Sequence, residues 1–129
     1  MLKSGKNMSQ DRRLVAIMFT DIVGYSKLMA EDEKQTLAIL DQNRTIHQSA
    51  ANNHHGNILK YNGDGTLLSF QTSTDAVACA SEIQNMLASG HDYEVRIGIH
   101  EGEAVFTEND VLGDGVKRSQ ITTPKSKPS

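Results

Sequence analysis

The sequence LVAIMFTDIVGYS occupies residues 14–26. Its first six residues form a continuous apolar run, which predicts a β-strand that is covered on both faces. The run ends near a carboxylate, Asp21, and Gly24 then interrupts the strand pattern before Ser26, a residue type that caps helices. The stretch therefore predicts a buried strand that leads through a short turn into a helix.

Residues 27–54 carry apolar side chains at a loosely helical spacing. Either one bent helix or two helices would fit this spacing. The acidic cluster at residues 31–33 suits the start of a second helix, because carboxylates interact favourably with the helix dipole there. The apolar positions that we expect to follow this spacing are Leu28, Leu37, Leu40, Ile46 and Ala50.

Two β-like runs, residues 58–61 and 66–70, flank the sequence Asn62-Gly63-Asp64-Gly65. Asparagine and glycine tolerate the positive φ of tight turns, so this pattern predicts a β-hairpin. Residues 72–75 then offer a cap for a helix that Gly90 closes. The side chains that we expect on one face of this helix are Val77, Ala80, Ile83, Gln84 and Leu87.

Residues 93–100 alternate apolar and polar side chains, which is typical of a half-buried strand. We expect Gly102 to turn this strand into a second run at residues 103–107. The order of strand, one or two helices, hairpin, helix and two strands predicts an α+β fold of ferredoxin-like kind, with helices on one face of a mainly antiparallel sheet. The residues expected to point inward from the first of these strands are Val95, Ile97 and Ile99.

The composition limits the classes of function. The 129 residues suffice for one domain of ordinary size. Thirteen basic against 16 acidic residues give a net charge of −3, which argues against nucleic acid and anionic membrane as partners, since both call for an excess of Lys and Arg. The single cysteine, Cys79, cannot form an internal disulfide, and this fits a reducing, cytoplasmic setting. No run of eighteen apolar residues occurs, so we expect no membrane contact by this segment.

Three segments of the chain differ in character. Residues 1–11 are polar and without periodicity, and we expect a flexible lead there. Residues 12–116 hold all the predicted elements and form the predicted domain. Residues 117–129 are basic and contain two prolines and only one aliphatic side chain, a composition that predicts a disordered tail.

Two carboxylates are candidates for a metal site. Asp21 follows the buried strand, and Asp64 lies at the tip of the hairpin that we expect to pair beside it. Two carboxylates on adjacent strand ends can hold Mg²⁺ or Mn²⁺, which prefer oxygen ligands and keep positions open for phosphate. Alternatively, Asp21 caps a helix and Asp64 fills a turn, because aspartate is common in both places. The turn at residues 22–26 can also bind phosphate through its N–H groups, since Gly24 permits close approach.

Four motifs occur in order along the chain: FTDIVGYS at 19–26, KYNGDG at 60–65, RIGIHEGE at 96–103 and DVLGDGV at 110–116. In order and approximate spacing they resemble the class III nucleotidyl cyclase catalytic domain, over about residues 12–116. The resemblance implies the ferredoxin-like α/β sandwich of that family. It also implies an adenylyl cyclase, in which the ribose 3′-hydroxyl of ATP attacks the α-phosphate to give 3′,5′-cyclic AMP and pyrophosphate.

The resemblance implies roles for the residues at matching positions. Asp21 and Asp64 match the family's metal-binding aspartates, which hold two Mg²⁺ or Mn²⁺ ions together with a backbone carbonyl, here that of Ile22. Lys60 and Asp110 match the pair that reads the purine, and the family uses Lys with Asp or Thr for adenine but Glu with Cys for guanine. A lysine donates to an adenine ring nitrogen and a carboxylate accepts from its exocyclic amine, so ATP is the implied substrate. The residues that match the triphosphate-binding turn are Gly24, Tyr25 and Ser26.

The chain departs from the family pattern after residues 113–116. The pattern calls for Asn and, four positions later, Arg, which orient the ribose and stabilise the transferring phosphate, whereas this chain has Lys117 and Ile121. Isoleucine carries no charge, so the missing arginine would cost several kcal/mol of transition-state stabilisation. We therefore expect a truncated or frame-shifted cyclase domain that lacks its C-terminal helix and strands and is weakly active or inactive. The alternative is a non-catalytic nucleotide-binding or dimerising regulatory module.

Members of the family act as dimers, with the metal site from one subunit and the purine-reading residues from its partner. A sheet that lacks its last strands also exposes unpaired edges, which favour association. The resemblance therefore implies a homodimer or a strand-exchanged oligomer.

Overall fold

The computed structural model describes residues 11–106 and 111–112. The predicted tail at 117–129 lies outside the described residues, as does the predicted lead except for Asp11, which already belongs to the first strand. The elements are, in chain order, β1 (Asp11–Ile22), α2 (Tyr25–Glu31), α3 (Glu33–Asn53), β2 (Asn57–Asn62), β3 (Gly65–Phe70), α4 (Ser73–Ala88), β4 (Val95–Phe106) and β5 (Val111–Leu112).

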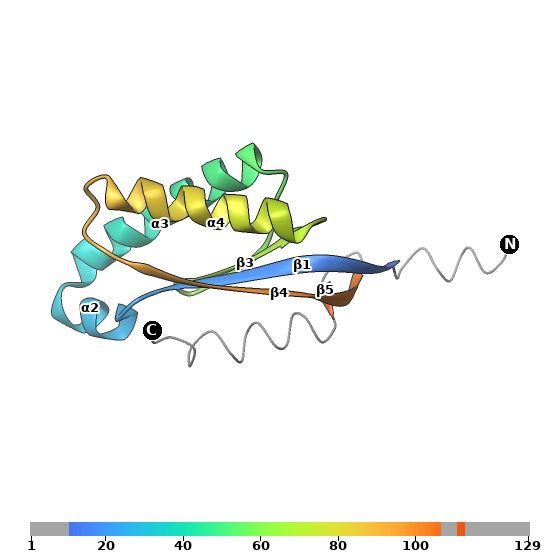
Figure 1. The fold of residues 1–129 in the computed structure, drawn as a ribbon. Helices are drawn as coiled ribbons and strands as arrows, with labels where there is room; N and C mark the ends of the chain where they lie inside the picture. The colour runs from blue at the N-terminus through green and yellow to red at the C-terminus, as the bar shows by residue number, and fades with distance from the viewer. Residues whose placement is uncertain (1–10, 107–110, 113–129) are drawn as a thin grey trace, which may run out of the picture.

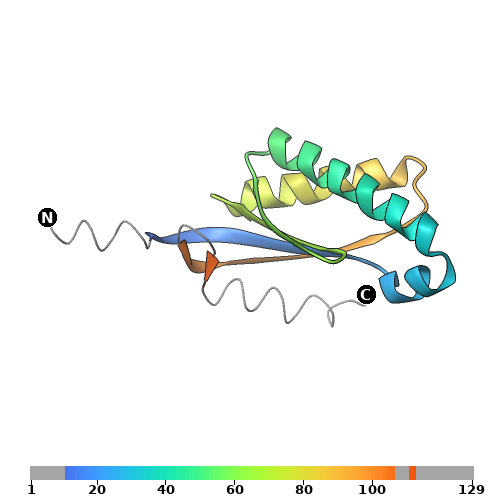
Figure 2. The ribbon, with the colours of Figure 1, turned by 180° about the vertical axis from the view of Figure 1, so that it is seen from behind.

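The strands form one sheet in the order β2-β3-β1-β4-β5, and every neighbouring pair is antiparallel. Strand β3 lies between β1 and β2, which is the split βαβ arrangement of a ferredoxin-like fold. Helices α3 and α4 pack on one face of the sheet, and the short helix α2 lies beyond the end of β1 (Figure 1; Figure 2 shows the opposite view). The predicted α+β fold is therefore confirmed.

Strand β4 continues through Gly102, so the turn predicted there is wrong. The strand pairs with β1 without interruption, from Val95 opposite Ile22 to Phe106 opposite Asp11. A Cβ atom at Gly102 would lie 3.2 Å from Nε2 of His100, so the glycine makes room for this ring within a regular strand. Within the second run predicted at 103–107, residues 103–106 are the last part of β4 itself, and β5 pairs with this part of β4.

Two helices follow β1, as one of the two alternatives predicted. They separate at Asp32, whose side chain accepts a hydrogen bond from the backbone N–H of Gln35 at 3.0 Å and so caps α3. The expected capping role of Ser26 is wrong, because Gly24 occupies the N-cap position of α2 with a φ of 69°. Glycine reaches this left-handed conformation without the steric cost that other residues pay.

The main core fills the space between the sheet and the two long helices. Ala16, Met18, Leu68 and Phe70 of the sheet meet Ile39, Ile46, Cys79 and Ile83 of the helices there. Ile99, which was expected to point inward, is 37% exposed. Two apolar residues that were expected to follow the helical pattern are also exposed, Leu37 by 49% and Val77 by 55%. On α4 Ile83 and Leu87 are buried as predicted, but the first half of the buried stripe runs through Ala76 and Cys79, one residue before the predicted positions. On α3 the buried stripe includes polar residues that a hydrophobic pattern does not mark.

The second face of the sheet carries a smaller buried cluster. It consists of Val15, Ile17, Leu67 and Ala104. Strand β1 is therefore covered on both faces, as its continuous apolar run predicted. Among the described helices, none has the length and apolar character needed to cross a bilayer.

Helix α3 offers a direct test of this packing. Ile39 is 5% exposed and Leu37 is 49% exposed on the same helix. We expect Ile39→Ala to lower the free energy of unfolding by about 2–5 kcal/mol, because it leaves a cavity in the core. The matched substitution Leu37→Ala should cost less than about 1 kcal/mol, since it removes a solvated side chain. Urea denaturation followed by circular dichroism measures both, and equal losses would contradict the packing described.

Candidate active site

The end of β1 and the tip of the β2–β3 hairpin meet at one edge of the domain. Thr20 pairs with Thr66 in the ladder, which brings the turn at Gly63 and Asp64 beside the last residues of β1. The backbone N–H of Ile22 donates a hydrogen bond to Oδ2 of Asp64 at 2.9 Å. The hairpin was predicted, and the structure brings its carboxylate next to Asp21, as expected.

A third charged group lies in the same place. Arg96 of β4 is directly opposite Asp21 in the β1–β4 ladder, and its Nε lies 3.0 Å from Oδ1 of Asp21. The Asp21 side chain is 13% exposed and that of Arg96 is 35% exposed. The ion pair is therefore partly shielded from water. The local charges are one guanidinium, that of Arg96, and two carboxylates, those of Asp21 and Asp64. The alternative role of Asp21 as a helix cap is excluded, because Gly24 is the N-cap of α2.

The charge at Asp64 responds to this environment. Burial raises the pKa of its carboxyl group above the ordinary value, and the nearby Asp21 carboxylate raises it further. Hydrogen bonds from the N–H groups of Ile22 and of Asp64 itself, together with the charge of Arg96, lower the pKa and offset part of this effect. Because the surroundings disfavour the charged form of Asp64, a cation bound beside this carboxylate would stabilise its negative charge.

The residues present fit a hard divalent cation. Both side chains offer carboxylate oxygens, which Mg²⁺ and Mn²⁺ prefer to nitrogen or sulfur. Among the described residues, no group of three or more His, Cys, Asp or Glu side chains forms a metal-binding cluster. Two carboxylates with one backbone carbonyl would hold an ion incompletely, which leaves positions for water or phosphate oxygens.

The turn after β1 exposes backbone donors near the carboxylates. Val23 donates its N–H to the carbonyl oxygen of Glu94 at 2.9 Å, which fixes the start of the turn. Helix α2 then begins at Tyr25 without a side-chain cap, and the first N–H to find a helical partner is that of Leu28, bonded to Gly24. The N–H groups of the first turn of a helix have no partner within it. Ser26 therefore lies within the first turn, among these donors.

Of the two purine-reading candidates, Lys60 lies apart from the carboxylates. Lys60 is exposed on β2, opposite Leu67, just after an irregularity in the strand register. Strand β2 is at the edge of the sheet, and β3 separates it from β1 and Asp21. Asp110 lies outside the described residues, as do Lys117 and Ile121.

Comparison with known proteins decides the family. Residues 8–118 match the adenylate and guanylate cyclase catalytic domain. The chain belongs to this family. A putative adenylate cyclase 3 of Rhizobium meliloti (strain 1021) is 36% identical to this cyclase domain over 113 residues, which are 81% of this chain and 19% of that protein. The chain thus spans about a fifth of the length of this relative.

Solved structures agree with this assignment. An adenylate/guanylate cyclase/hydrolase from Silicibacter pomeroyi is 33% identical with a TM-score of 0.81, and the match covers 92% of this cyclase domain and 74% of that chain. The guanylate cyclase domain of RhGC from Catenaria anguillulae, solved in complex with GTP, has a TM-score of 0.77 at 20% identity, with 91% and 76% of the two chains covered. The second likeness supports the fold alone.

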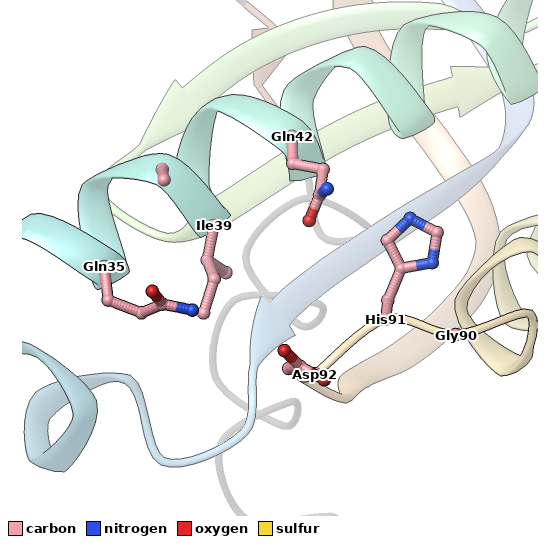
Figure 3. A pocket seen from close by; sticks show the side chains of 7 residues that line it. Gln35, Ile39, Gln42, Gly90, His91 and Asp92 are labelled. Carbon is pink, nitrogen blue, oxygen red and sulfur yellow. The ribbon is translucent and has the colours of Figure 1, made fainter.

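The cyclase domain also has a cavity away from the carboxylates. It measures about 230 Å³ and lies between α3 and the loop that joins α4 to β4 (Figure 3). Gln35, Ile39 and Gln42 line it from the helix, and His91 and Asp92 line it from the loop. Nδ1 of His91 is buried, and no residue in the described part of the chain forms a hydrogen bond with it. A water molecule in this polar cavity would satisfy it.

Sequence reasoning did not single out Arg96, although this residue begins one of the four motifs. The contact of Arg96 with Asp21 depends on the register between β1 and β4, and these two residues are 75 positions apart in the sequence. An arginine near the start of a strand that alternates apolar and polar side chains is a weak local signal, and the sequence does not say which carboxylate the arginine faces.

Proposed function

We propose that this chain is an adenylyl cyclase catalytic domain that converts ATP to 3′,5′-cyclic AMP and pyrophosphate. The ribose 3′-hydroxyl attacks the α-phosphorus, the bond between the α-phosphorus and the bridging oxygen breaks, and pyrophosphate leaves with that oxygen. The proposal is carried by the convergence of Asp21 and Asp64 around the Ile22 amide, in a domain of the cyclase family.

Asp21 and Asp64 are the proposed ligands of two Mg²⁺ or Mn²⁺ ions, with the backbone carbonyl of Ile22 as a third donor. When bound, the ions supply Lewis-acid stabilisation of the phosphate charge. The N–H of Ile22 orients the Asp64 carboxylate, and the ion pair with Arg96 orients the Asp21 carboxylate. The Arg96 guanidinium could also bind a phosphate group, with two parallel hydrogen bonds to two of its oxygens.

The turn formed by Gly24, Tyr25 and Ser26 is the proposed seat of the triphosphate. Its donors lie directly after Asp21, so the metal ligands and the phosphate-binding amides come from one continuous stretch. The left-handed Gly24 carries no side chain at the point where a phosphate would approach, and among residues 11–106 and 111–112 no atom outside its chain neighbours lies within 4 Å of the position that a Cβ would take.

Lys60 and Asp110 are the proposed purine-reading pair, with adenine as their base. Strand β3 lies between the strand that carries Lys60 and the strand that carries Asp21, which supports a role for this lysine at the metal site of another copy of the chain rather than at its own. We therefore propose a homodimer or a strand-exchanged oligomer as the working form. Multi-angle light scattering should give at least twice the mass of the chain, and a clean monomer at high concentration would contradict this.

Chromatographic detection of cyclic AMP and pyrophosphate from Mn-ATP tests the proposed activity. We expect slow formation of both in equal amounts, less product from Mn-GTP, and none from the Asp21→Ala variant. Turnover that survives Asp21→Ala would overturn the proposed mechanism. A preference for GTP would overturn the assigned base and leave the metal site standing.

A second candidate function is a nucleotide-binding or dimerising module without turnover. It is favoured by Lys117 and Ile121, which stand where the family pattern has asparagine and arginine. This candidate predicts Mn-ATP binding that depends on Asp21, measured by calorimetry, with no cyclic AMP formed. The two candidates therefore differ only in turnover.

A further inference from the structure

A buried polar network lies behind the candidate active site, between helix α3 and the sheet. His47 Nε2 is 2.8 Å from Oγ1 of Thr20, and His47 Nδ1 is 2.8 Å from the backbone carbonyl oxygen of Asn43. The hydroxyl of Tyr93 donates to Oδ1 of Asn43 at 3.1 Å. Each of these four residues is at most 6% exposed. Buried polar side chains with complete hydrogen bonding restrict one another to a single arrangement.

The directions of these hydrogen bonds fix the state of the His47 ring. The Asn43 carbonyl can only accept, so Nδ1 of His47 carries the proton. In a neutral ring Nε2 then accepts from the hydroxyl of Thr20. Burial lowers the pKa of His47 and outweighs the Asn43 hydrogen bond, which raises it. The ring is therefore neutral at pH 7 and holds one tautomer.

This network holds the strand ends that carry the site. Thr20 directly precedes Asp21, and successive side chains of a strand point to opposite faces. His47 therefore holds Thr20 from the helix side, while Arg96 holds Asp21 from the other face at 3.0 Å. Tyr93 lies three residues before Arg96 and is bonded to Asn43, one helical turn from His47. One turn of α3 thus fastens both β1 and the chain that leads into β4.

We propose that His47 is a positioning residue, which acts through Thr20 to fix the end of β1 and so to direct Asp21 toward a divalent cation. This inference rests on the proposed function, in which Asp21 and Asp64 hold the ions. Replacement of a side chain that orients a metal ligand through hydrogen bonds typically weakens metal binding by about 10–100-fold. His47 and Thr20 touch neither the nucleotide nor the ions in this scheme.

The test measures the Mn²⁺ dissociation constant by the electron paramagnetic resonance of free Mn²⁺, on the full chain and four variants. Thr20→Val removes the hydroxyl at nearly constant shape, and Thr20→Ser keeps it. Ile83→Val is the control for stability alone, since Ile83 is fully buried in α4 and lies in the apolar core. Asp21→Asn tests the metal site itself.

We expect Thr20→Val to weaken Mn²⁺ binding roughly tenfold. Thr20→Ser should bind like the parent chain, and so should Ile83→Val despite its lower melting temperature. Equal affinities for Thr20→Val and Ile83→Val would overturn the positioning role while the metal site stands. Parent-like binding by Asp21→Asn would overturn the metal site, and the inference with it.

A measurement on the unaltered chain keeps the inference open to refutation if Thr20→Val does not fold. The ¹⁵N NMR shifts of the His47 ring should report a protonated Nδ1, and saturation with Mg²⁺ should move the Nε2 signal. A mixture of the two ring tautomers would overturn the role assigned to His47. So would an Nε2 chemical shift that does not change when Mg²⁺ is added.

Discussion

Asp64→Asn should abolish Mn²⁺ binding and reduce cyclase turnover by roughly a thousandfold, which corresponds to about 4 kcal/mol of transition-state stabilisation. The amide keeps the shape of the side chain and can still accept the hydrogen bond from Ile22, so the hairpin should stay in place. What the variant loses is the negative charge that we propose holds the cations. Calorimetric titration with Mn²⁺ measures the binding, and cyclic AMP formation from Mn-ATP measures the turnover.

The same variant should be more stable than the parent chain when no divalent cation is present. The folded-state pKa of Asp64 is raised above its ordinary value of 3.8, so the folded chain binds this proton more tightly than the unfolded chain does. The stability that this group contributes is present below pH 3.8 and is lost as the pH rises through the folded-state pKa. At pH 7 the carboxylate therefore destabilises the fold, and Asn removes that cost.

Addition of Mn²⁺ should reverse the order of stability. A ligand at 100 times its dissociation constant stabilises the folded state by about 2.7 kcal/mol, and only the parent chain would gain this. Asp41→Asn is a matched control, because Asp41 is an exposed carboxylate on α3 away from the site. Thermal unfolding with and without Mn²⁺ at pH 7 compares the three chains. Stabilisation of Asp64→Asn by Mn²⁺ equal to that of the parent would contradict the metal site.

The fold could be predicted where its causes are local. The apolar run of β1, the Asn62-Gly63 turn and the cap at Thr72 each depend on residues that are neighbours in the chain, and the structure has all three. Gly102 was misread because glycine serves both in turns and at close approaches within strands. Only the packing against His100 shows which of the two applies.

The buried face of α3 shows why hydrophobic periodicity was insufficient. Asn43 and His47 occupy core positions because Tyr93 and Thr20 satisfy them, and these partners lie 50 and 27 residues away. A sequence pattern that scores polar residues as solvated places Leu37 inward instead. Partners that are distant in the sequence also limit the prediction of the site. Asp21 was a candidate because it lies at the end of a predicted strand, but its contact with Arg96 could be found only from the β1–β4 register.

Replacement of residues 117–129 should have the opposite effect to Asp64→Asn. If these residues are exchanged for the segment that carries the family's asparagine and arginine at positions 117 and 121, we expect cyclic AMP formation to rise at least about 100-fold. One positive group aimed at the charge that develops on the transferring phosphate has an effect of this size. Ile121 cannot supply this charge, because isoleucine carries none, and Lys117 cannot replace the asparagine, because a lysine side chain cannot accept a hydrogen bond from the ribose.

The control is the same exchanged segment with alanine in place of its arginine, which restores any missing packing without the charge. We expect this control to regain stability and oligomerisation but to stay close to the parent rate. If both exchanged chains gained activity equally, packing rather than charge would limit the parent chain. If neither gained activity while both bound Mn-ATP through Asp21, the non-catalytic alternative would be correct, because the nucleotide would then be bound in a chain that has the family's arginine and still would not react.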